Sequence, residues 1–227
     1  MNIIVLISGL GSNLQALIDA EHLKKLNGTI TDVILSQADA YGLKRAEKAL
    51  IPSQVHLLKE YYKGTPKEEK DKRQQLRKKF DKDLADIIIA KKPDLVVCAG
   101  WMLILLPAIL DPLKAAGITI INLHPALPNA FDGTHAIERA WKAGQAGEIT
   151  KAGVMIHYVI ADVDKGEPIV IKELDLRKDE LLDDYEDRVH KLEHVAIVEG
   201  TNKVLDKIAK DKATDDDMAK AAEKIKI

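Results

Sequence analysis

An amide and an imidazole lie two residues apart where a predicted strand ends. The apolar run Ile118 to Asn122 leads directly into His124 and Pro125. Because alternate residues of an extended chain point to the same face, the side chains of Asn122 and His124 can converge on one atom. An amide N–H stabilises a developing oxyanion, and an imidazole of pKa about 6.5 accepts a proton near neutral pH. The pair suits acyl transfer to an amine, although a strand-end histidine is also common as a structural hydrogen-bonding residue.

No serine or cysteine occupies a position beside this pair from which it could form a covalent intermediate. Cys98, the only cysteine, lies in the apolar run Asp94 to Gly100, where we expect it to be buried. This pattern favours direct transfer between two substrates. A single cysteine also excludes an internal disulfide and favours a reducing compartment, so we expect a cytoplasmic protein.

An aspartate in a later turn could complete the set. Asp164 precedes Gly166 in a predicted turn between the strands Gly153 to Val159 and Pro168 to Glu173. A carboxylate there could orient the His124 imidazole and relay the proton that the attacking amine loses. A turn-forming aspartate before a glycine is also common, so both interpretations stay open from spacing alone.

A glycine-containing turn connects the first predicted strand, Ile3 to Ile7, to a helix. It contains Gly11, Ser12 and Asn13. Backbone N–H groups at a helix N-terminus bind anions, and Ser12 and Asn13 add side-chain donors, so a phosphate is the expected ligand. A dinucleotide fingerprint would need a third glycine where the chain has Leu14. Two glycines are also consistent with nothing more than a tight turn.

Short apolar runs alternate with helical patterns, which is typical of a Rossmann-like α/β fold with a mostly parallel sheet flanked by helices. Further strands are predicted at Ile30 to Leu35, Gln54 to Leu57 and Leu95 to Cys98, and helices at Asn13 to Leu26, Tyr41 to Leu50 and Glu68 to Ala90. The charged segment Lys59 to Lys79 is expected to be solvated.

The pattern after Asn122 predicts a mixed C-terminal part. A helix from His135 to Ala143 precedes the two strands around Asp164, and a long helix is expected from Asp179 to Lys210. The tail from residue 211 to 227 is predicted to be a further helix, which Thr214 would cap at its start.

The charges indicate what the chain does not bind. The sequence contains 34 Lys and Arg against 36 Asp and Glu, a net charge of -2, which disfavours nucleic acid and anionic membranes as partners. No apolar stretch is long enough to span a bilayer, and no basic segment follows Met1. His190 and His194 are four residues apart on one predicted helix, but the segment does not have the His-Glu-x-x-His order of a zinc protease, so we expect no metal.

Four segments, taken in order, resemble the signatures of the phosphoribosylglycinamide formyltransferase family. They are Ile7 to Gln15, Ala99 to Met102, Asn122 to Pro128 and His157 to Gly166. The resemblance covers about residues 1 to 210. The tract Phe131 to Trp141 and the insertion after Leu57 are most similar to the monofunctional fungal type.

The resemblance implies a formyltransferase fold and an enzyme of purine biosynthesis. Its co-substrate would be 10-formyltetrahydrofolate, and its acceptor the amine of glycinamide ribonucleotide. A phosphate-binding half of about residues 1–100 would precede a folate-binding and catalytic half of about residues 101–210. Both partners would be small molecules, and the chain a monomer or weak homodimer.

The resemblance also assigns roles to residues. Asn122, His124 and Asp164 would be the catalytic set, and His135 and His157 would support it. The ribotide would be bound by Gly11, Ser12, Asn13, Glu193 and His190. The folate would be bound by Trp101, Met102, Leu103, Ile104, Leu105, Val159, Ile160 and Ala161.

Three residues depart from the family pattern. Leu10 occupies a position that is usually small or polar, Leu103 one that is often arginine in bacterial members, and Asn129 one where glycine is expected in fungal members. Asparagine tolerates a positive φ better than most residues, so the loop after the His-Pro motif can keep its shape.

Two other functions are compatible with the same residues. A formyltransferase acting on an amino-sugar nucleotide is the main enzymatic alternative, and a catalytically silent protein that binds folate or ribotide is the other. The formyltransferases that act on initiator tRNA carry an extra basic domain, and we expect none from this sequence. The glycine-containing turn favours a small phosphorylated acceptor.

Overall fold

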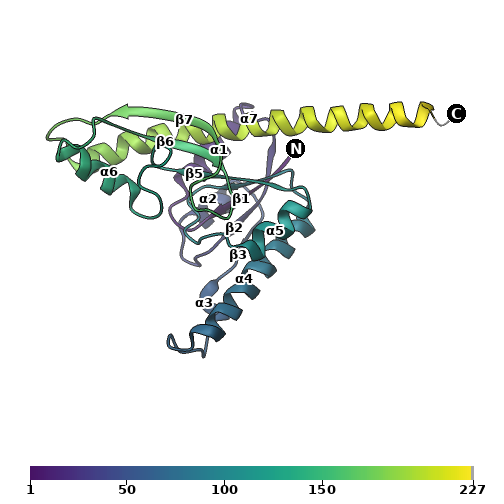
Figure 1. The fold of residues 1–227 in the computed structure, drawn as a ribbon, viewed down its shortest axis with the longest axis horizontal. Coiled ribbons are helices and arrows are strands. Elements are labelled where there is room, and N and C mark those ends of the chain that lie inside the picture. The colour runs from purple at the N-terminus through teal and green to yellow at the C-terminus, as the bar shows by residue number, and fades with distance from the viewer. Residues whose placement is uncertain (226–227) are drawn as a thin grey trace.

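A computed structural model describes residues 1–225, with side chains as far as Asp215. Seven strands form one sheet in the order β3-β2-β1-β4-β5-β6-β7 (Figure 1). They are β1 Asn2–Ile7, β2 Thr29–Leu35, β3 Ser53–Val55, β4 Leu95–Cys98, β5 Thr119–His124, β6 Lys151–Tyr158 and β7 Pro168–Asp175. The strands from β3 through β5 are parallel, whereas β6 and β7 pair antiparallel. This confirms the predicted mostly parallel sheet with a mixed C-terminal part.

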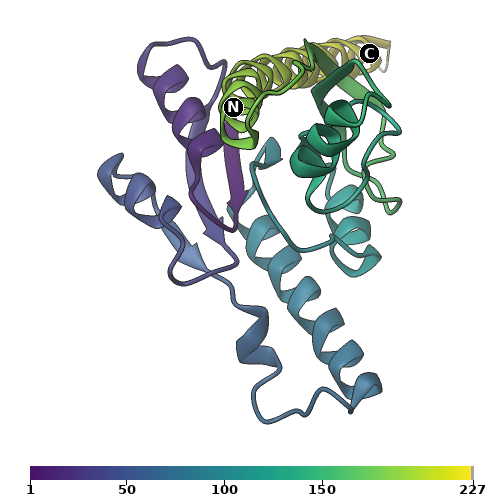
Figure 2. The same ribbon diagram turned by 90° about the vertical axis from the view of Figure 1, so that its left-hand side faces the viewer.

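Helices cover both faces of the sheet. They are α1 Ser12–His22, α2 Gly42–Lys48, α3 Leu58–Tyr61, α4 Lys70–Lys91, α5 Pro107–Ala115, α6 Ala136–Gln145 and α7 Leu182–Ile225. In β1, Ile3 and Val5 pack in a core shared with α1, α6 and α7, whereas Ile4 and Leu6 pack in a second core with α4 and α5. Figure 2 shows α7 nearly end-on at one side, with α3 and α4 extending from the other. Alternate side chains of the strand thus point into apolar layers on opposite faces of the sheet.

The helix α5 was missed by the sequence analysis. Pro112 lies inside it, and an internal proline normally argues against a helix. Pro107 occupies the first turn, where its missing N–H costs nothing. Ile109 and Leu113 are fully buried against the second core, and this packing outweighs the unfavourable proline.

The last helix is longer than predicted. It runs unbroken from Leu182 to Ile225, so a new helix start at Thr214 is wrong. The Thr214 hydroxyl donates to the Lys210 carbonyl inside the helix. The first part of α7 packs on α1, β6 and β7, and its end extends past the sheet (Figure 1). Residues 226 and 227 of the predicted tail lie outside the described part. No described helix is long and apolar enough to cross a bilayer.

Candidate active site

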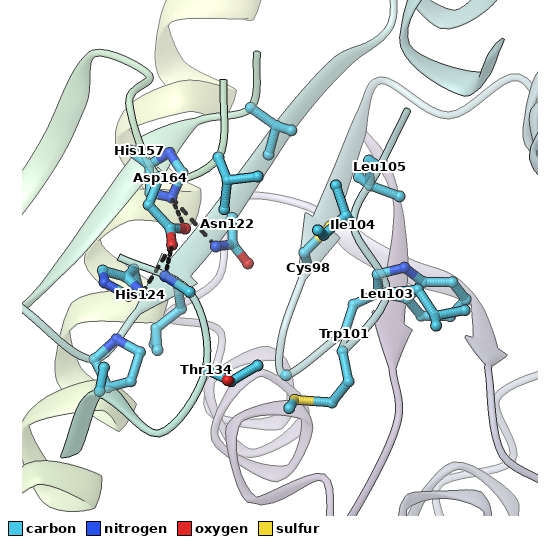
Figure 3. A pocket seen from close by; sticks show the side chains of 18 of the residues that line it. Cys98, Trp101, Leu103, Ile104, Leu105, Asn122, His124, Thr134, His157 and Asp164 are labelled. Atoms are coloured by element: carbon cyan, nitrogen blue, oxygen red, sulfur yellow. Dashed lines mark hydrogen bonds and ion pairs between the residues drawn. The ribbon is translucent and has the colours of Figure 1, made fainter. Parts of the chain in front are cut away.

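A cleft of about 280 Å³ opens where β4 and β5 end. The chain leaves β1 toward β2 on one side and returns to β4 on the other, and such a reversal of strand order creates a crevice at the carboxyl ends of parallel strands. Figure 3 shows polar side chains on one wall of this cleft and mostly apolar ones on the opposite wall. The polar wall contains Asn122, His124, His157 and Asp164.

The register of β5 and β6 places an amide against an imidazole. Asn122 lies opposite His157, and Nδ2 of Asn122 is 3.2 Å from Nε2 of His157. Nδ1 of the same ring lies 2.8 Å from the Tyr158 carbonyl, which can only accept a hydrogen bond. In the neutral ring Nδ1 therefore carries the proton and Nε2 accepts from Asn122, whereas a protonated ring would donate from Nε2 to Asp164. The imidazole thus fixes which end of the Asn122 amide is nitrogen.

Asp164 lies between two histidines. Its Oδ2 is 3.5 Å from Nδ1 of His124, and its Oδ1 is 3.5 Å from Nε2 of His157. The backbone N–H of Gly133 donates to Oδ2 at 2.9 Å. Burial of the carboxyl, which is 8% exposed, opposes ionisation, but the His157, Gly133 and His124 groups outweigh it and lower the pKa of Asp164. The carboxylate form is therefore the stable one.

His124 is held as a neutral imidazole. It is 3% exposed, and burial lowers its pKa although Asp164 works in the opposite direction. Its Nε2 lies 3.4 Å from the Ala130 carbonyl, a contact at the long end of hydrogen bonding. The charged Asp164 is the stronger acceptor and favours the proton on Nδ1. This tautomer leaves Nε2 free to act as a base.

The turn before α1 brings two glycines together. Gly11 has a φ of 71°, and a Cβ there would lie 2.9 Å from the Cα of Gly42. The Arg45 side chain donates to the Leu10 carbonyl at 2.8 Å, which anchors the turn from outside, while the Leu10 side chain is 73% exposed. Leu10 therefore departs from the family pattern without filling the site.

Asn13 lines the cleft and contacts α7 through its side-chain amide. Its Nδ2 donates to Oε2 of Glu193 at 3.3 Å, and His190 contacts the same oxygen at 2.9 Å. Glu193 is 4% exposed, and its carboxylate raises the pKa of His190. Oδ1 of Asn13 is buried, and no partner for it lies in the part of the chain that the structure describes. Its amide nitrogen has two N–H groups and Glu193 receives one of them, so a further donor from this side chain stays a prediction.

The loop after β4 forms the apolar wall and is tied to β1. The Ser8 N–H donates to the Gly100 carbonyl at 3.0 Å, and the Met102 N–H donates to Oγ of Ser8 at 2.8 Å. Oγ of Ser8 is also 2.6 Å from Oγ of Ser36. The loop that carries the predicted folate residues is thus hydrogen-bonded to the strand that leads into the predicted phosphate turn.

The other side of the loop is tied to α4. Arg77 donates to both carboxyl oxygens of the fully buried Asp81, at 3.0 and 3.2 Å, and to the Ile104 carbonyl. Because burial opposes ionisation of Asp81, its pKa is raised even though Arg77 lowers it. The segment Lys59 to Lys79 is mainly solvated, as expected, but Arg77 is a partly buried exception that contacts the loop lining the site.

Most of the predicted site residues line the cleft. These are Asn13, Trp101, Met102, Leu103, Ile104, Leu105, Asn122, His124, His135, His157, Val159, Ile160, Asp164 and Glu193. Four predicted residues lie outside its lining: Gly11, Ser12, Ala161 and His190. Among them, His190 reaches the site through Glu193. No group of three potential metal ligands occurs among the described residues.

Several residues of the lining were not predicted from the sequence, among them Cys98, Gly133 and Thr134. Cys98 lies beside Asn122 in the parallel register of β4 and β5, so strand parity could have indicated it. Burial raises its pKa to about 12, which keeps it a thiol. Gly133 was concealed in a loop whose path the sequence does not reveal.

Comparison with known proteins agrees with this geometry. Residues 1–201 match the family model described as Formyl transferase. The fold and the site thus define a member of the formyl transferase class, an α/β enzyme with an Asn-x-His pair at the end of a central strand.

Individual relatives identify the family within this class. The chain is 51% identical to phosphoribosylglycinamide formyltransferase from Saccharomyces cerevisiae, over 92% of this chain and 99% of the yeast protein. It is 48% identical to the same enzyme from Schizosaccharomyces pombe, over 90% and 97%. A crystal structure of glycinamide ribonucleotide transformylase 1 from Symbiobacterium toebii superposes with a TM-score of 0.75 at 31% identity, over 89% and 86%. The chain belongs to the phosphoribosylglycinamide formyltransferase family.

Proposed function

We propose that this protein transfers the formyl group of 10-formyltetrahydrofolate to the amine of glycinamide ribonucleotide in purine biosynthesis. The observation that carries the proposal is the convergence of Asn122, His124 and Asp164 on one cleft. Family membership supports the reaction class, and formyl folate is the co-substrate of this family. Relatives that cover nearly all of both chains support the acceptor.

The arrangement supports direct transfer. The substrate amine attacks the formyl carbon, and the carbonyl oxygen becomes an oxyanion. The Asn122 nitrogen has two N–H groups, of which His157 receives one, and the second donates to this oxyanion. Nε2 of His124 takes the proton that the amine loses, while Asp164 stabilises the imidazolium. The tetrahedral intermediate then releases the folate nitrogen, which takes the proton from the His124 imidazolium as the carbon–nitrogen bond breaks, so that His124 returns to its neutral form.

The acceptor would lie between α1 and α7. The free N–H groups of the α1 N-terminus, at Ser12 and Asn13, suit its phosphate. Oδ1 of Asn13 and the buried carboxylate of Glu193 are acceptors, so they suit hydroxyl or amine hydrogens of the ribotide. His190, whose pKa is raised, adds positive charge near the phosphate. The folate would occupy the apolar wall formed by the loop after β4 and the Val159 to Asp164 turn.

The residues of the cleft favour small-molecule substrates, and they favour a transfer without a covalent enzyme intermediate. Cys98 is the only cysteine in the chain, and its raised pKa makes it a poor nucleophile. We place the protein in the cytoplasm, as a monomer or weak homodimer that needs no metal. These assignments rest on cysteine usage, charge balance and the residues of the site.

Purified protein mixed with 10-formyl-5,8-dideazafolate and glycinamide ribonucleotide tests the function. We expect deformylation of the folate that depends on the ribotide and is followed by absorbance. An amino-sugar nucleotide should give no signal. Signal with the sugar nucleotide alone would establish the enzymatic alternative. Folded protein that binds both ligands without turnover would establish the silent alternative.

The pKa values of two histidines of the site should be shifted in opposite directions. Burial lowers the pKa of His124 below the usual value near 6.5, and the Glu193 carboxylate raises that of His190 above it. As pH falls from 8, His190 should therefore protonate first and His124 afterwards. Titration of the imidazole carbons by NMR, with each signal assigned from the alanine variant, measures the order. The reverse order would contradict the neutral base.

A further inference from the structure

The segment between β5 and α6 has little regular structure but carries an important donor. Residues 125–135 contain neither helix nor strand, and four of them have positive φ: Asn129, Phe131, Gly133 and His135. The N–H of Gly133 donates to Asp164, which lies in the turn between β6 and β7 and itself has a φ of 56°. The geometry of the catalytic carboxylate thus depends on how this loop and this turn are held together.

Lys165 bridges the two segments directly beside this hydrogen bond. Its Nζ lies 2.5 Å from Oδ2 of Asp132 and 3.3 Å from Oδ1 of Asn129. Asp132 and Lys165 are the sequence neighbours of Gly133 and Asp164, so the ion pair and the hydrogen bond connect the same two stretches of backbone. Neither Lys165 nor Asp132 lines the cleft.

The loop side of this bridge is fixed in turn. The Arg139 guanidinium donates to the Asp132 carbonyl at 2.9 Å, and it lies 5.5 Å from the centre of the Phe131 ring. Asn129, which departs from the family pattern, adopts a φ of 62° and contributes its side-chain oxygen to the bridge. A glycine at this position could adopt the same backbone but could not contact Lys165.

We propose that Lys165 is a positioning residue for the catalytic carboxylate. Its ammonium group, held by Asp132 and Asn129, fixes the loop against the turn so that the Gly133 N–H stays on Asp164. The inference rests on the proposed function for its effect on catalysis. Its structural part, the link between Lys165 and Gly133, can be measured without any turnover.

The test replaces Lys165→Met, which keeps most of the stem and removes the charge. The control is Lys172→Met, because Lys172 forms an ion pair of 2.6 Å with Glu199 on other elements. Hydrogen exchange of the Gly133 amide should accelerate about tenfold in Lys165→Met, and should not change in the control. Lys165→Arg restores a cation and should retain most of the protection.

The carboxylate itself gives the second readout. The groups that face Asp164 are His124 from β5, His157 from β6 and the Gly133 N–H, with Asp132 and Lys165 just beyond. Loss of the Gly133 donor should raise the NMR titration midpoint of Asp164 in Lys165→Met and leave it unchanged in Lys172→Met. We expect kcat to fall about tenfold with little change in the KM for the ribotide, because small misplacements of catalytic groups are costly.

Unchanged Gly133 exchange and an unchanged Asp164 midpoint in a folded Lys165→Met protein would overturn the proposal. If Lys165→Met does not fold, Asp132→Asn removes the same ion pair from the other side. Gly133 exchange and the Asp164 midpoint are then measured in that variant, with the same expected results. If the wild-type protein shows no turnover, the proposed function fails, but exchange and titration still judge the role of Lys165. The two failures are therefore distinguishable.

Discussion

Replacing His124→Ala is expected to lower kcat by a factor of about 10²–10⁴, the usual contribution of a positioned general base. The imidazole is buried beside Asp164, its pKa is lowered by that burial, and Nε2 is free to take the proton of the attacking amine. The KM for the ribotide should change little, because His124 is not among the groups we assign to ribotide binding. Steady-state kinetics with the dideazafolate assay measure both constants.

The loss should come from chemistry rather than from unfolding. The hydrogen-bonding contacts of His124 are long, at 3.4 and 3.5 Å, so its removal costs few strong interactions. Circular dichroism and thermal unfolding should therefore show a folded variant. His22→Ala, at an exposed histidine of α1, is the matched control and should retain full activity. Imidazole added to the medium should restore part of the lost rate. A folded His124→Ala protein with more than one tenth of the wild-type kcat would exclude the base role.

The part of the site that could be predicted from the sequence depends on local rules. Asn122 and His124 share strand parity, and both line the cleft as that parity predicts. The alternation of strands and helices likewise predicted the sheet. These inferences need only the spacing of residues along one element, which the sequence contains in full.

The rest of the site depends on contacts between distant segments. Asp164 meets the Gly133 N–H across 31 positions of the chain. A Cβ on Gly166 would lie 1.6 Å from the Tyr158 carbonyl, so the turn folds tightly over the end of β6. No periodicity of the sequence reports such an approach, and the predicted role of Asp164 came almost entirely from family resemblance, because its position in a turn left both interpretations open.

Buried charge was the hardest feature to anticipate. Asp81 lies in a helix dense in Lys and Arg, and the sequence offers no sign that it is fully buried and paired with Arg77. Asn13 shows the same limit, because an amide can donate or accept and only its contact with Glu193 decides which. Propensity describes elements well, but polar side chains take their roles from tertiary partners.

Asp164→Asn should also lower kcat by a factor of about 10²–10⁴, although the substitution keeps the size of the side chain. The carboxylate accepts from Gly133 through Oδ2 and faces both His124 and His157. An amide oxygen can still accept from Gly133 and an amide nitrogen can face Nε2 of His157, but the uncharged side chain no longer stabilises the imidazolium that His124 becomes. Removal of the charge also takes away the influence that raises the pKa of His124, so that pKa should fall further.

The control for this variant lies in the same turn. Asp162 is exposed, lies two residues away and does not line the cleft, and its replacement Asp162→Asn removes an equal charge without touching the histidines. We expect near wild-type kcat for Asp162→Asn and a loss specific to Asp164→Asn, together with a His124 titration midpoint displaced to lower pH in that variant alone. Equal kinetics in the two variants would mean that Asp164 only shapes the turn. Because His124 and Asp164 act on the same proton, the double variant should be little worse than either single one.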